Sequence, residues 1–302
     1  MDEFGFIKGL LRPLAGEGAL ALADDAASIA VPAGQELILT KDALVRGIHF
    51  IGNEPASQIA RKALRVNLSD CAAMGAKPFS YLMALMLPPN TSEEWLTSFT
   101  LGLQIDQEHF GVSLIGGDTT RTKGELAVSI TMLGLVPHGK ALRRNGAKAG
   151  DDIYVSGTIG DAALGLHNQS DAFLLQRYQL PEPRIALGQK LHGIASSCMD
   201  ISDGLVQDLG HICAASNVGA EILWPQIPLS DAARACNPKP EAILAGGDDY
   251  ELLFTAPSSA TTQLGTLQGI TRIGSITEGN SVKVIDENGA AIAMKRQGYR
   301  HF

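Results

Sequence analysis

The chain has 302 residues, of which 45% are hydrophobic and 19% are charged, and 24 basic and 32 acidic residues give it a formal net charge of −8. This length suits two domains of roughly 150 residues each. The acidic balance argues against a nucleic-acid partner or an anionic membrane surface, because both bind clustered lysine and arginine side chains.

Four cysteines, at positions 71, 198, 213 and 236, form no CxxC pair. This pattern argues against a zinc site or a disulfide framework and favours reduced thiols. The N-terminus is acidic and shows no apolar signal segment, and the longest apolar stretch, near residues 81–87, is far short of the roughly 20 residues that cross a bilayer. We therefore expect a cytoplasmic protein with no membrane partner.

Hydrophobic periodicity predicts the elements of the first half. Residues 4–14 and 57–74 are expected to form helices, and residues 36–40, 79–87, 112–115 and 126–136 are expected to form strands. A capping box at residues 91–94 predicts the start of a further helix that runs to about residue 110.

Three acidic turns are predicted between these elements, at residues 24–25 (Asp-Asp), 41–42 (Lys-Asp) and 116–118 (Gly-Gly-Asp). Paired glycines let a ligand approach the backbone closely, and a carboxylate beside them can hold a metal ion. Adjacent carboxylates are easier to keep when a cation lies beside them. Taken singly, each segment is explained as well by an ordinary turn with solvated aspartates.

The basic, glycine-containing segment 141–150 is the predicted boundary between domains 1–140 and 141–302. Beyond it we expect a strand at residues 152–155. A glycine turn follows at residues 156–162. Its backbone N–H groups could bind an anion, but simple helix initiation explains the turn equally well. Residues 171–194 are expected to be helical, with a break at Pro181 and Pro183.

Two more acidic turns follow in the second half. Asp200 and Asp203 precede leucine and isoleucine residues at helical spacing, so this turn is expected at a helix N-terminus. Ser202 or Asp203 as the helix cap is the simple explanation, but a cap does not need the second carboxylate of Asp200, which favours a metal site. Residues 246–249 (Gly-Gly-Asp-Asp) form the fifth turn and lead into a strand.

These turns carry more carboxylates than one metal ion requires, and several Mg²⁺ ions around a polyphosphate would use them. Residues 134–141 resemble a P-loop but do not match its motif. Neither a Gly-x-Ser-x-Gly turn nor a hydrolase triad is evident. The residues favour ATP-dependent phosphoryl transfer, in which positioning and charge neutralisation supply most of the catalytic effect.

The segments 23–27, 40–42 with His49, 67–76, 115–120, 200–205 and 246–252, taken in order, resemble the thiamine-monophosphate kinase family of the aminoimidazole-ribonucleotide-synthetase-like superfamily. The resemblance implies two α/β domains with mixed sheets. The N-terminal domain would bind ATP and Mg²⁺ and form a homodimer in which the sheets join into a barrel. The implied reaction moves the ATP γ-phosphoryl group in line to thiamine monophosphate, giving thiamine diphosphate and ADP.

The resemblance also implies a set of site residues. The Mg²⁺ ligands would be Asp25, Thr40, Asp42, Asp70, Asp118, Asp200 and Asp203, with Asp118 and Asp203 as the catalytic carboxylates. ATP would contact Gly117, Asp118, Arg144 and Ser202. Thiamine monophosphate would contact His49, Asp248 and Tyr299, whose ring can stack on a flat heteroaromatic group.

The chain departs from the family pattern at three positions. Ala23 replaces the usual glycine, Lys41 a serine or threonine, and Asp248 a glutamate. Lys41 would place a cation among the metal ligands, where it displaces one Mg²⁺ or touches a phosphate, and Asp248 would reach about one methylene less far.

Two alternatives to the kinase stay open. One is another ATP-dependent member of the superfamily, such as aminoimidazole ribonucleotide synthetase. The other is a catalytically inactive nucleotide-binding regulator. Selenophosphate synthetase and the hydrogenase-maturation member are disfavoured because the chain has no cysteine near its N-terminus or at its C-terminus.

Overall fold

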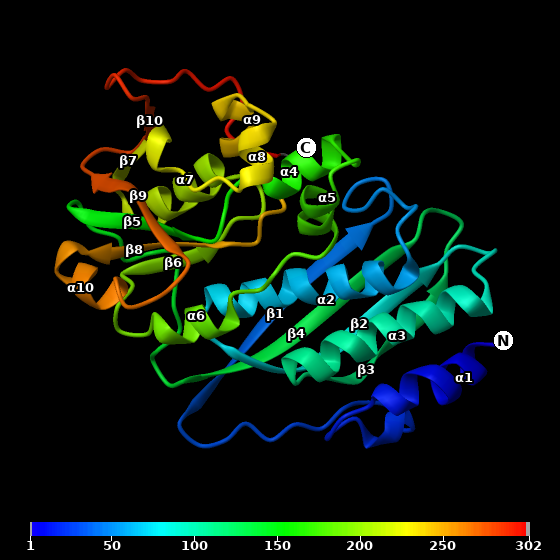
Figure 1. Cartoon of the computed structure of the whole chain (residues 1–302). Helices are drawn as coiled ribbons and strands as arrows, with labels where there is room; N and C mark the ends of the chain where they lie inside the picture. Colours follow the sequence, from blue (N-terminus) through cyan, green and yellow to red (C-terminus); the bar gives the residue numbers. More distant parts are fainter. Residues whose placement is uncertain (1, 300–302) are drawn as a thin grey trace. The chain divides into compact units, whose positions relative to one another are not determined.

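The computed structural model describes residues 2–299. It divides into two compact units, one of residues 1–71 with 76–139 and the other of residues 72–75 with 140–302. Figure 1 traces their helices and strands. Within the described part of the chain, none of the helices combines the length and the apolar character needed to span a bilayer.

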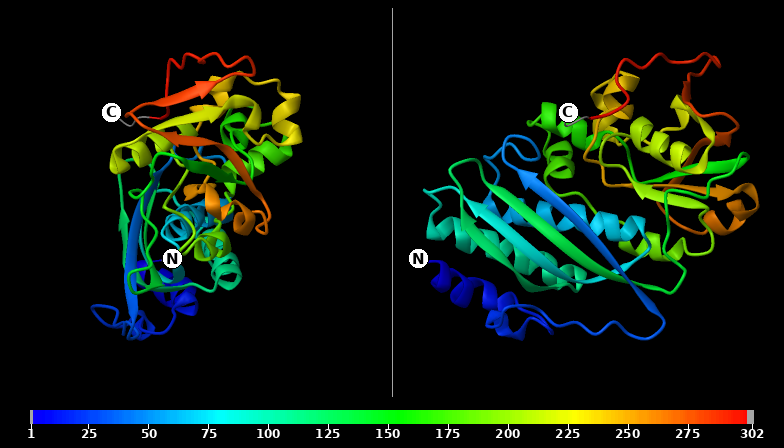
Figure 2. Two further views of the ribbon diagram at one scale, coloured as in Figure 1. Left: turned by 90° about the vertical axis from the view of Figure 1, so that its left-hand side faces the viewer. Right: turned by 180° about the vertical axis from the view of Figure 1, so that it is seen from behind.

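The first unit is built on a four-stranded mixed sheet in the order β1-β4-β2-β3. Its strands are β1 (Gln35–Val45), β2 (Lys77–Leu87), β3 (Ser113–Arg121) and β4 (Ala127–Pro137). β4 pairs antiparallel with β1 and β2, whereas β2 and β3 are parallel. The helices α2 (Ala56–Ala73) and α3 (Glu93–Phe110) cover one face of this sheet (Figure 1), and Figure 2 shows the opposite face from behind.

The long helix α3 begins and ends where the sequence predicts. The Ser92 side chain caps it by accepting a hydrogen bond from the Trp95 N–H at 3.1 Å. Gly111 ends it in a left-handed conformation with a φ of 67°, which glycine adopts without steric cost. The predicted helix at residues 57–74 is also confirmed, as α2.

The N-terminal segment is helical but irregular. Only α1 (Glu3–Phe6) is an α-helix, followed by a π-turn, η1 (Ile7–Leu11), and a 3₁₀ turn, η2 (Arg12–Leu14). Pro13 has no N–H with which to continue an α-helix. A 3₁₀ turn, η3 (Leu20–Leu22), follows further along the segment. Part of the segment packs on the sheet, where Ala19, just before η3, forms a small apolar cluster with Ile115 and Leu133.

Two of the predicted turns lie inside strands, so their prediction as turns was wrong. Residues 41–42 continue β1 opposite residues 130–131 of β4. Residues 116–118 continue β3 opposite residues 82–84 of β2. Lys-Asp and Gly-Gly-Asp favour turns locally, but pairing with neighbouring strands outweighs that preference.

The second unit contains a six-stranded sheet in the order β10-β7-β9-β5-β8-β6. Its strands are β5 (Asp151–Ser156), β6 (Ser197–Asp200), β7 (Gly219–Leu223), β8 (Leu252–Pro257), β9 (Ile270–Thr277) and β10 (Val282–Ile285). Only β10 and β7 are parallel, so this sheet is also mixed. The expected α/β fold with mixed sheets in both halves is confirmed.

Short helices surround this sheet. They are α4 (Asp161–His167), α5 (Ala172–Gln179), α6 (Ile185–Lys190), α7 (Leu205–Ser216), η4 (Trp224–Gln226), α8 (Asp231–Ala235), α9 (Pro240–Leu244), η5 (Ser258–Ala260) and α10 (Thr261–Leu264). The break predicted at Pro181 and Pro183 separates α5 from α6.

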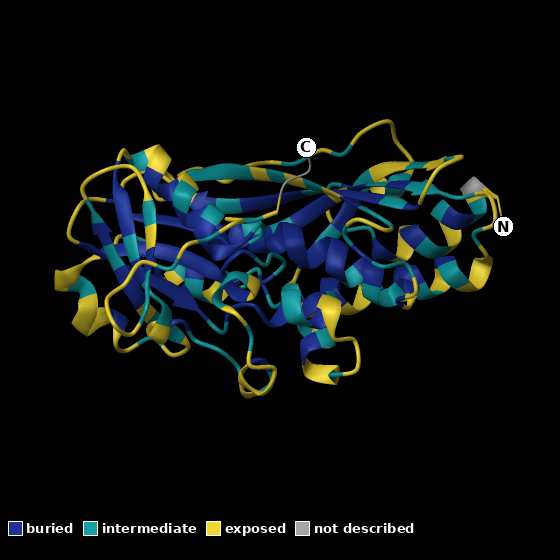
Figure 3. Cartoon of the chain, turned by 90° about the horizontal axis from the view of Figure 1, so that it is seen from above, coloured by how far each residue is buried: buried dark blue, intermediate teal, exposed yellow. Residues whose placement is uncertain are grey.

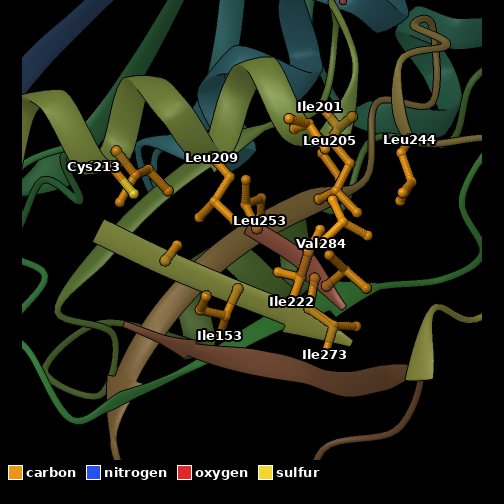
Figure 4. Close-up of a cluster of buried hydrophobic side chains, with 14 of the residues drawn as sticks. Ile153, Ile201, Leu205, Leu209, Cys213, Ile222, Leu244, Leu253, Ile273 and Val284 are labelled. Carbon is orange, nitrogen blue, oxygen red and sulfur yellow. The ribbon is translucent and has the colours of Figure 1, made fainter. Parts of the chain in front are cut away.

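The largest helix of the second unit, α7, supplies much of its core. Leu205, Leu209 and Ile212 are fully buried and form one apolar cluster with strand residues such as Ile222 and Leu253 (Figure 4). Figure 3 colours the chain by burial, and most strand residues of this second unit are buried whereas many of its connecting loops are exposed. Burial of each large aliphatic side chain contributes roughly 1.5–3 kcal/mol, which fixes α7 and the loop that precedes it.

Candidate active site

Two predicted metal ligands of the first unit, Thr40 and Asp42, lie on the helix-covered face of its sheet. Thr40 pairs with Met132 and Asp42 with Ile130, and both partners are fully buried. Directly paired residues share a face, because side chains alternate along each strand. Thr40 and Asp42 therefore face the helices.

The helix α2 brings a third predicted ligand, Asp70, to the same place. The Thr40 hydroxyl donates a hydrogen bond to the Asp70 carboxylate. The Asp42 N–H donates to Oδ1 of the buried Asn67 at 3.0 Å. The side of α2 that carries Asn67 and Asp70 thus meets β1, and Thr40, Asp42 and Asp70 lie together.

Lys41 lies apart from these side chains. It is between Thr40 and Asp42 in β1, so its own side chain is on the opposite face of the sheet. It is exposed, and it has no hydrogen-bond or ion-pair partner among residues 2–299. Lys41 therefore does not put its cation beside Thr40 and Asp42 of its own chain, and its role among the other predicted ligands stays a prediction.

A cavity of about 640 Å³ lies between the N-terminal segment and β3. Asp24 and Asp25 reach it from the loop after η3, and Gly116, Gly117 and Asp118 reach it from β3. Its remaining wall is largely apolar and includes Ile7, Leu11, Leu22, Leu82 and Leu133. The structure therefore brings Asp25, Gly117 and Asp118 to one cavity.

Gly117 allows the backbone to pass close to β2 at this cavity. Its φ is 152°, and a Cβ placed there would lie 1.9 Å from the Met83 carbonyl oxygen. A side chain is therefore excluded at residue 117, and the β3 backbone beside Asp118 stays bare.

His49 follows β1 and is fixed by hydrogen bonds. Its Nδ1 accepts the Val45 N–H at 3.0 Å, and its carbonyl oxygen accepts a bond from the Lys62 ammonium group at 2.9 Å. Because Nδ1 is an acceptor, the ring of neutral His49 carries its proton on Nε2. The prediction that His49 contacts substrate stays a prediction.

In the second unit, backbone hydrogen bonds join two of the predicted acidic turns. The β6–β8 pairing ends at Asp200 and Leu252. Beyond it, the Asp248 N–H donates to the Ser202 carbonyl oxygen at 2.9 Å, and the Tyr250 N–H donates to Ile201 at 2.8 Å. Asp200, Ser202 and Asp248, assigned from the resemblance to metal, nucleotide and substrate, are thus held on adjoining backbone segments.

The turn before α7 is capped by a residue that the sequence did not single out. Oδ2 of Asp208 accepts the N–H groups of Ser202, Asp203 and Gly204, each at 3.1 Å. Neither Ser202 nor Asp203 serves as a side-chain cap. Burial and the nearby Asp203 carboxylate raise the pKa of Asp208 to about 7. An aspartate inside the following helix gave no local signal of this role.

Tyr299 is tied to the same turn. Its N–H donates to the Asp203 carbonyl oxygen at 2.9 Å, and Nε2 of Gln207 donates to both the Tyr299 carbonyl oxygen and the Asp203 carboxylate. Tyr299 is 41% exposed, so part of its surface is accessible to solvent. Arg144, by contrast, is an exposed residue that no hydrogen bond links to this turn.

The donor groups gathered in each unit suit a hard divalent cation. They are carboxylate and hydroxyl oxygens, which Mg²⁺ prefers, with no thiolate among them. Asp203 also forms a cluster with Asp208 and His211, in which ligand atoms lie within 4.8 Å of one another. The residues present therefore fit the Mg²⁺ that the sequence predicted.

Two family models and a curated relative each match long stretches of the chain. Residues 23–136 match the N-terminal domain model of AIR synthase related proteins, and residues 148–287 match the C-terminal domain model. The thiamine-monophosphate kinase of Escherichia coli strain K12 is 42% identical, over 94% of this chain and 92% of that protein.

Two solved structures are similar over nearly their whole length. The thiamine-monophosphate kinase from Stenotrophomonas maltophilia superposes with a TM-score of 0.83 at 41% identity, covering 93% of this chain and 94% of that one. The structure of AaThiL complexed with AMPPCP and TMP superposes with a TM-score of 0.80 at 32% identity, covering 99% and 97%.

Proposed function

The chain belongs to the thiamine-monophosphate kinase family, and from this we propose that it transfers the γ-phosphoryl group of ATP to thiamine monophosphate. A phosphate oxygen of thiamine monophosphate forms the new bond to the γ-phosphorus, and the bond from that phosphorus to the bridging oxygen of ADP breaks. The products are thiamine diphosphate and ADP.

One observation carries this proposal. The chain matches, over 99% of its length, a protein whose structure holds AMPPCP, an ATP analogue, together with TMP. Both ligands belong to that protein, and their transfer to this chain is our inference. The cavity beside Gly117 supports it, because carboxylates next to a bare backbone and an apolar wall suit a nucleotide.

We propose that Mg²⁺ is held by the carboxylates and the hydroxyl predicted from the sequence: Asp25, Thr40, Asp42, Asp70, Asp118, Asp200 and Asp203. Bound Mg²⁺ would neutralise phosphate charge, which a chain of net charge −8 does not do by itself. Within this set, Asp118 and Asp203 are proposed as the catalytic carboxylates, because each adjoins a proposed nucleotide contact, Gly117 and Ser202.

The remaining side chains are proposed to bind and orient the two substrates. Gly117 admits the nucleotide close to the β3 backbone. The exposed Arg144 guanidinium is proposed to contact the phosphates of ATP. His49 and Asp248 are proposed to hold thiamine monophosphate, and the partly exposed Tyr299 is proposed to stack on its heteroaromatic group.

We also propose a homodimer formed through the sheet face of the first unit that α2 and α3 leave uncovered. Leu39 is 61% exposed and Leu82 is 36% exposed. Both lie on that face, since Leu39 pairs with Leu133 and Leu82 with Thr131. Covering such residues with a second copy would remove apolar surface from water. The barrel implied by the resemblance belongs to this proposal.

A cytoplasmic location is likewise proposed. It is supported by the four cysteines, which are all unpaired, as is usual in a reducing compartment.

An ADP-release assay with purified protein, ATP, Mg²⁺ and thiamine monophosphate tests the proposed reaction. We expect ADP to form only when thiamine monophosphate is present, with thiamine diphosphate in equal amount. Nucleotide binding without turnover would instead support an inactive regulator. Turnover with the substrate of aminoimidazole ribonucleotide synthetase but not with thiamine monophosphate would support that alternative.

A further inference from the structure

The loop that carries Asp248 is anchored by a buried carboxylate, Glu251, to which neither the sequence nor the proposed reaction gives a role. Glu251 is fully buried. It accepts a hydrogen bond from the Ser156 hydroxyl at 2.5 Å. A buried carboxylate is tolerated only where hydrogen bonds and opposite charges replace its hydration.

Two arginines from outside the loop supply that compensation. Nη2 of Arg177, on α5, donates to Glu251 Oε1 at 2.7 Å. Arg184, just before α6, donates from Nε to Oε2 and from Nη2 to Oε1, each at 2.6 Å. The Arg184 contact is a bidentate pair, which fixes the direction of the carboxylate as well as its position. We call Glu251, Arg177 and Arg184 the arginine clamp.

The backbone next to the clamp is strained. Asp248 has a φ of 65° and Tyr250 a φ of 51°, in the left-handed region that residues with a side chain rarely adopt. Such a conformation persists only where its surroundings impose it. The residues that follow each of these two, Asp249 and Glu251, have buried side chains held by hydrogen bonds. Glu251 is bound in the clamp, and the Asp249 carboxylate accepts a hydrogen bond from the Gly160 N–H at 2.9 Å.

The clamp also reaches the turn that carries Ser202. The Glu251 carbonyl oxygen accepts the Ile201 N–H at 2.9 Å, and the Ser202 carbonyl oxygen accepts the Asp248 N–H at the same distance. Fixing Glu251 therefore fixes both the strained loop and its hydrogen-bonded neighbour.

We propose that Arg177 and Arg184 are positioning residues for thiamine monophosphate, acting through Glu251 to hold Asp248 in its left-handed conformation. This inference rests on the proposed function and on the assignment of Asp248 to that substrate. Neither arginine touches substrate. Each arginine acts by holding the conformation of the loop that carries Asp248. Replacing either arginine should therefore weaken the binding of thiamine monophosphate more than it slows the phosphoryl transfer.

A cavity of about 510 Å³ gives access to the clamp from outside. It is lined by Ser156, Gly157 and Arg184 and by the loop at residues 266–269. Arg177, in contrast, does not line it. A small cation can therefore reach the position of the Arg184 guanidinium if that side chain is shortened.

The first test replaces Arg184 by lysine, which keeps the charge but cannot form the bidentate pair. We expect the KM for thiamine monophosphate to rise about tenfold while kcat stays within about threefold of wild type. A merely structural role would lower the amount of active enzyme and hence the apparent kcat, with KM unchanged. Should Arg184→Lys fail to fold, Arg177→Lys gives the same comparison.

Arg272→Lys is the matched control. Arg272 also pairs with a carboxylate in the second unit, Asp152, at 2.6 Å, but that pair lies between β9 and β5 and does not contact the loop. We expect wild-type KM for this variant. Equal increases in KM for Arg184→Lys and Arg272→Lys would overturn the positioning role.

The second test is chemical rescue. In Arg184→Ala, millimolar guanidinium chloride is expected to lower the KM for thiamine monophosphate towards the wild-type value, because the cavity admits the ion. Arg177→Ala, which opens no such path, is expected to show no rescue. A KM of Arg184→Ala that guanidinium leaves unchanged would count against the clamp.

Failure of this inference is distinguishable from failure of the proposed function. Wild-type protein without turnover on thiamine monophosphate would overturn both. Asp248→Asn with wild-type KM would remove Asp248 from substrate recognition and the positioning role with it. A raised KM in Asp248→Asn, together with wild-type KM in both arginine-to-lysine variants, would overturn the clamp alone.

Discussion

Asp42 and Asp118 lie at the same level of the first sheet, on opposite faces of it. Asp42 is in register, through β4 and β2, with Gly117, the residue before Asp118. Three strand spacings of about 4.8 Å separate β1 from β3, or roughly 14 Å. Mg²⁺ binds its oxygen ligands at about 2.1 Å, so these two carboxylates of one chain cannot hold the same ion.

This separation makes the proposed homodimer testable by mixing inactive variants. Asp42→Asn and Asp118→Asn are each expected to lower kcat on the order of 10²–10³-fold. If one site takes Asp42 from one copy and Asp118 from its partner, a mixed dimer contains one intact site. After random mixing, about half of the dimers contain one copy of each variant. Each such dimer has one intact site out of two, so activity recovers to about a quarter of wild type.

The mixing experiment needs two controls. Asp42→Asn mixed with itself is expected to recover nothing. Native mass spectrometry shows whether mixed dimers have formed. Mixed dimers with no recovered activity would mean that both carboxylates act within one chain on separate ions, which contradicts a shared site.

The backbone of β3 gives a second prediction, on stability. Gly117→Ala is expected to lower the free energy of unfolding by at least about 2 kcal/mol, because a Cβ there would clash with the Met83 carbonyl oxygen. Gly116→Ala is the matched control. Its Cβ would meet only the flexible Leu82 side chain, at 3.1 Å, so the expected loss is smaller. Urea unfolding of both variants measures the difference, and equal losses would contradict this account.

Thiol reactivity at pH 8 gives a third prediction. Cys71, Cys198 and Cys213 are buried, and burial raises the pKa of the Cys213 thiol to about 11. Below that pKa it remains a protonated, unreactive thiol, and its reactivity rises only as the pH approaches 11. Cys236 is exposed. Native protein should therefore react quickly with a thiol reagent at one site per chain, and Cys236→Ser at none. Two fast thiols in native protein would contradict the burial of the other three.

Most helices and strands were predicted correctly from the sequence. Some of the candidate site residues, however, were expected in turns and lie in strands. Hydrophobic periodicity located α2, β2 and β4, and the capping box at residues 91–94 located the start of α3. The prediction was wrong at residues 41–42 and 116–118, where local turn preference competes with pairing to strands distant in the chain. The error matters for function, because strand alternation puts Lys41 and Asp42 on different faces.

The arginine clamp and the Asp208 cap could not be predicted from the sequence. Arg177 and Glu251 are 74 residues apart, and nothing local marks them as partners. Asp208 lies within the apolar pattern of α7, where an aspartate normally indicates a solvated face. Both roles arise because the fold brings distant backbone segments together around a buried side chain. Hydrophobic periodicity along the sequence carries no information on such contacts.

The predicted carboxylates are proposed to bind nucleotide phosphate through a divalent cation. Isothermal titration of wild-type protein with AMPPCP, first in Mg²⁺ and then in EDTA, tests it most directly. We predict that affinity falls at least about 100-fold in EDTA, because the aspartates then repel the phosphates. The same loss is predicted for Asp118→Asn in Mg²⁺. Equal affinity of the wild-type protein for AMPPCP in Mg²⁺ and in EDTA would contradict the claim.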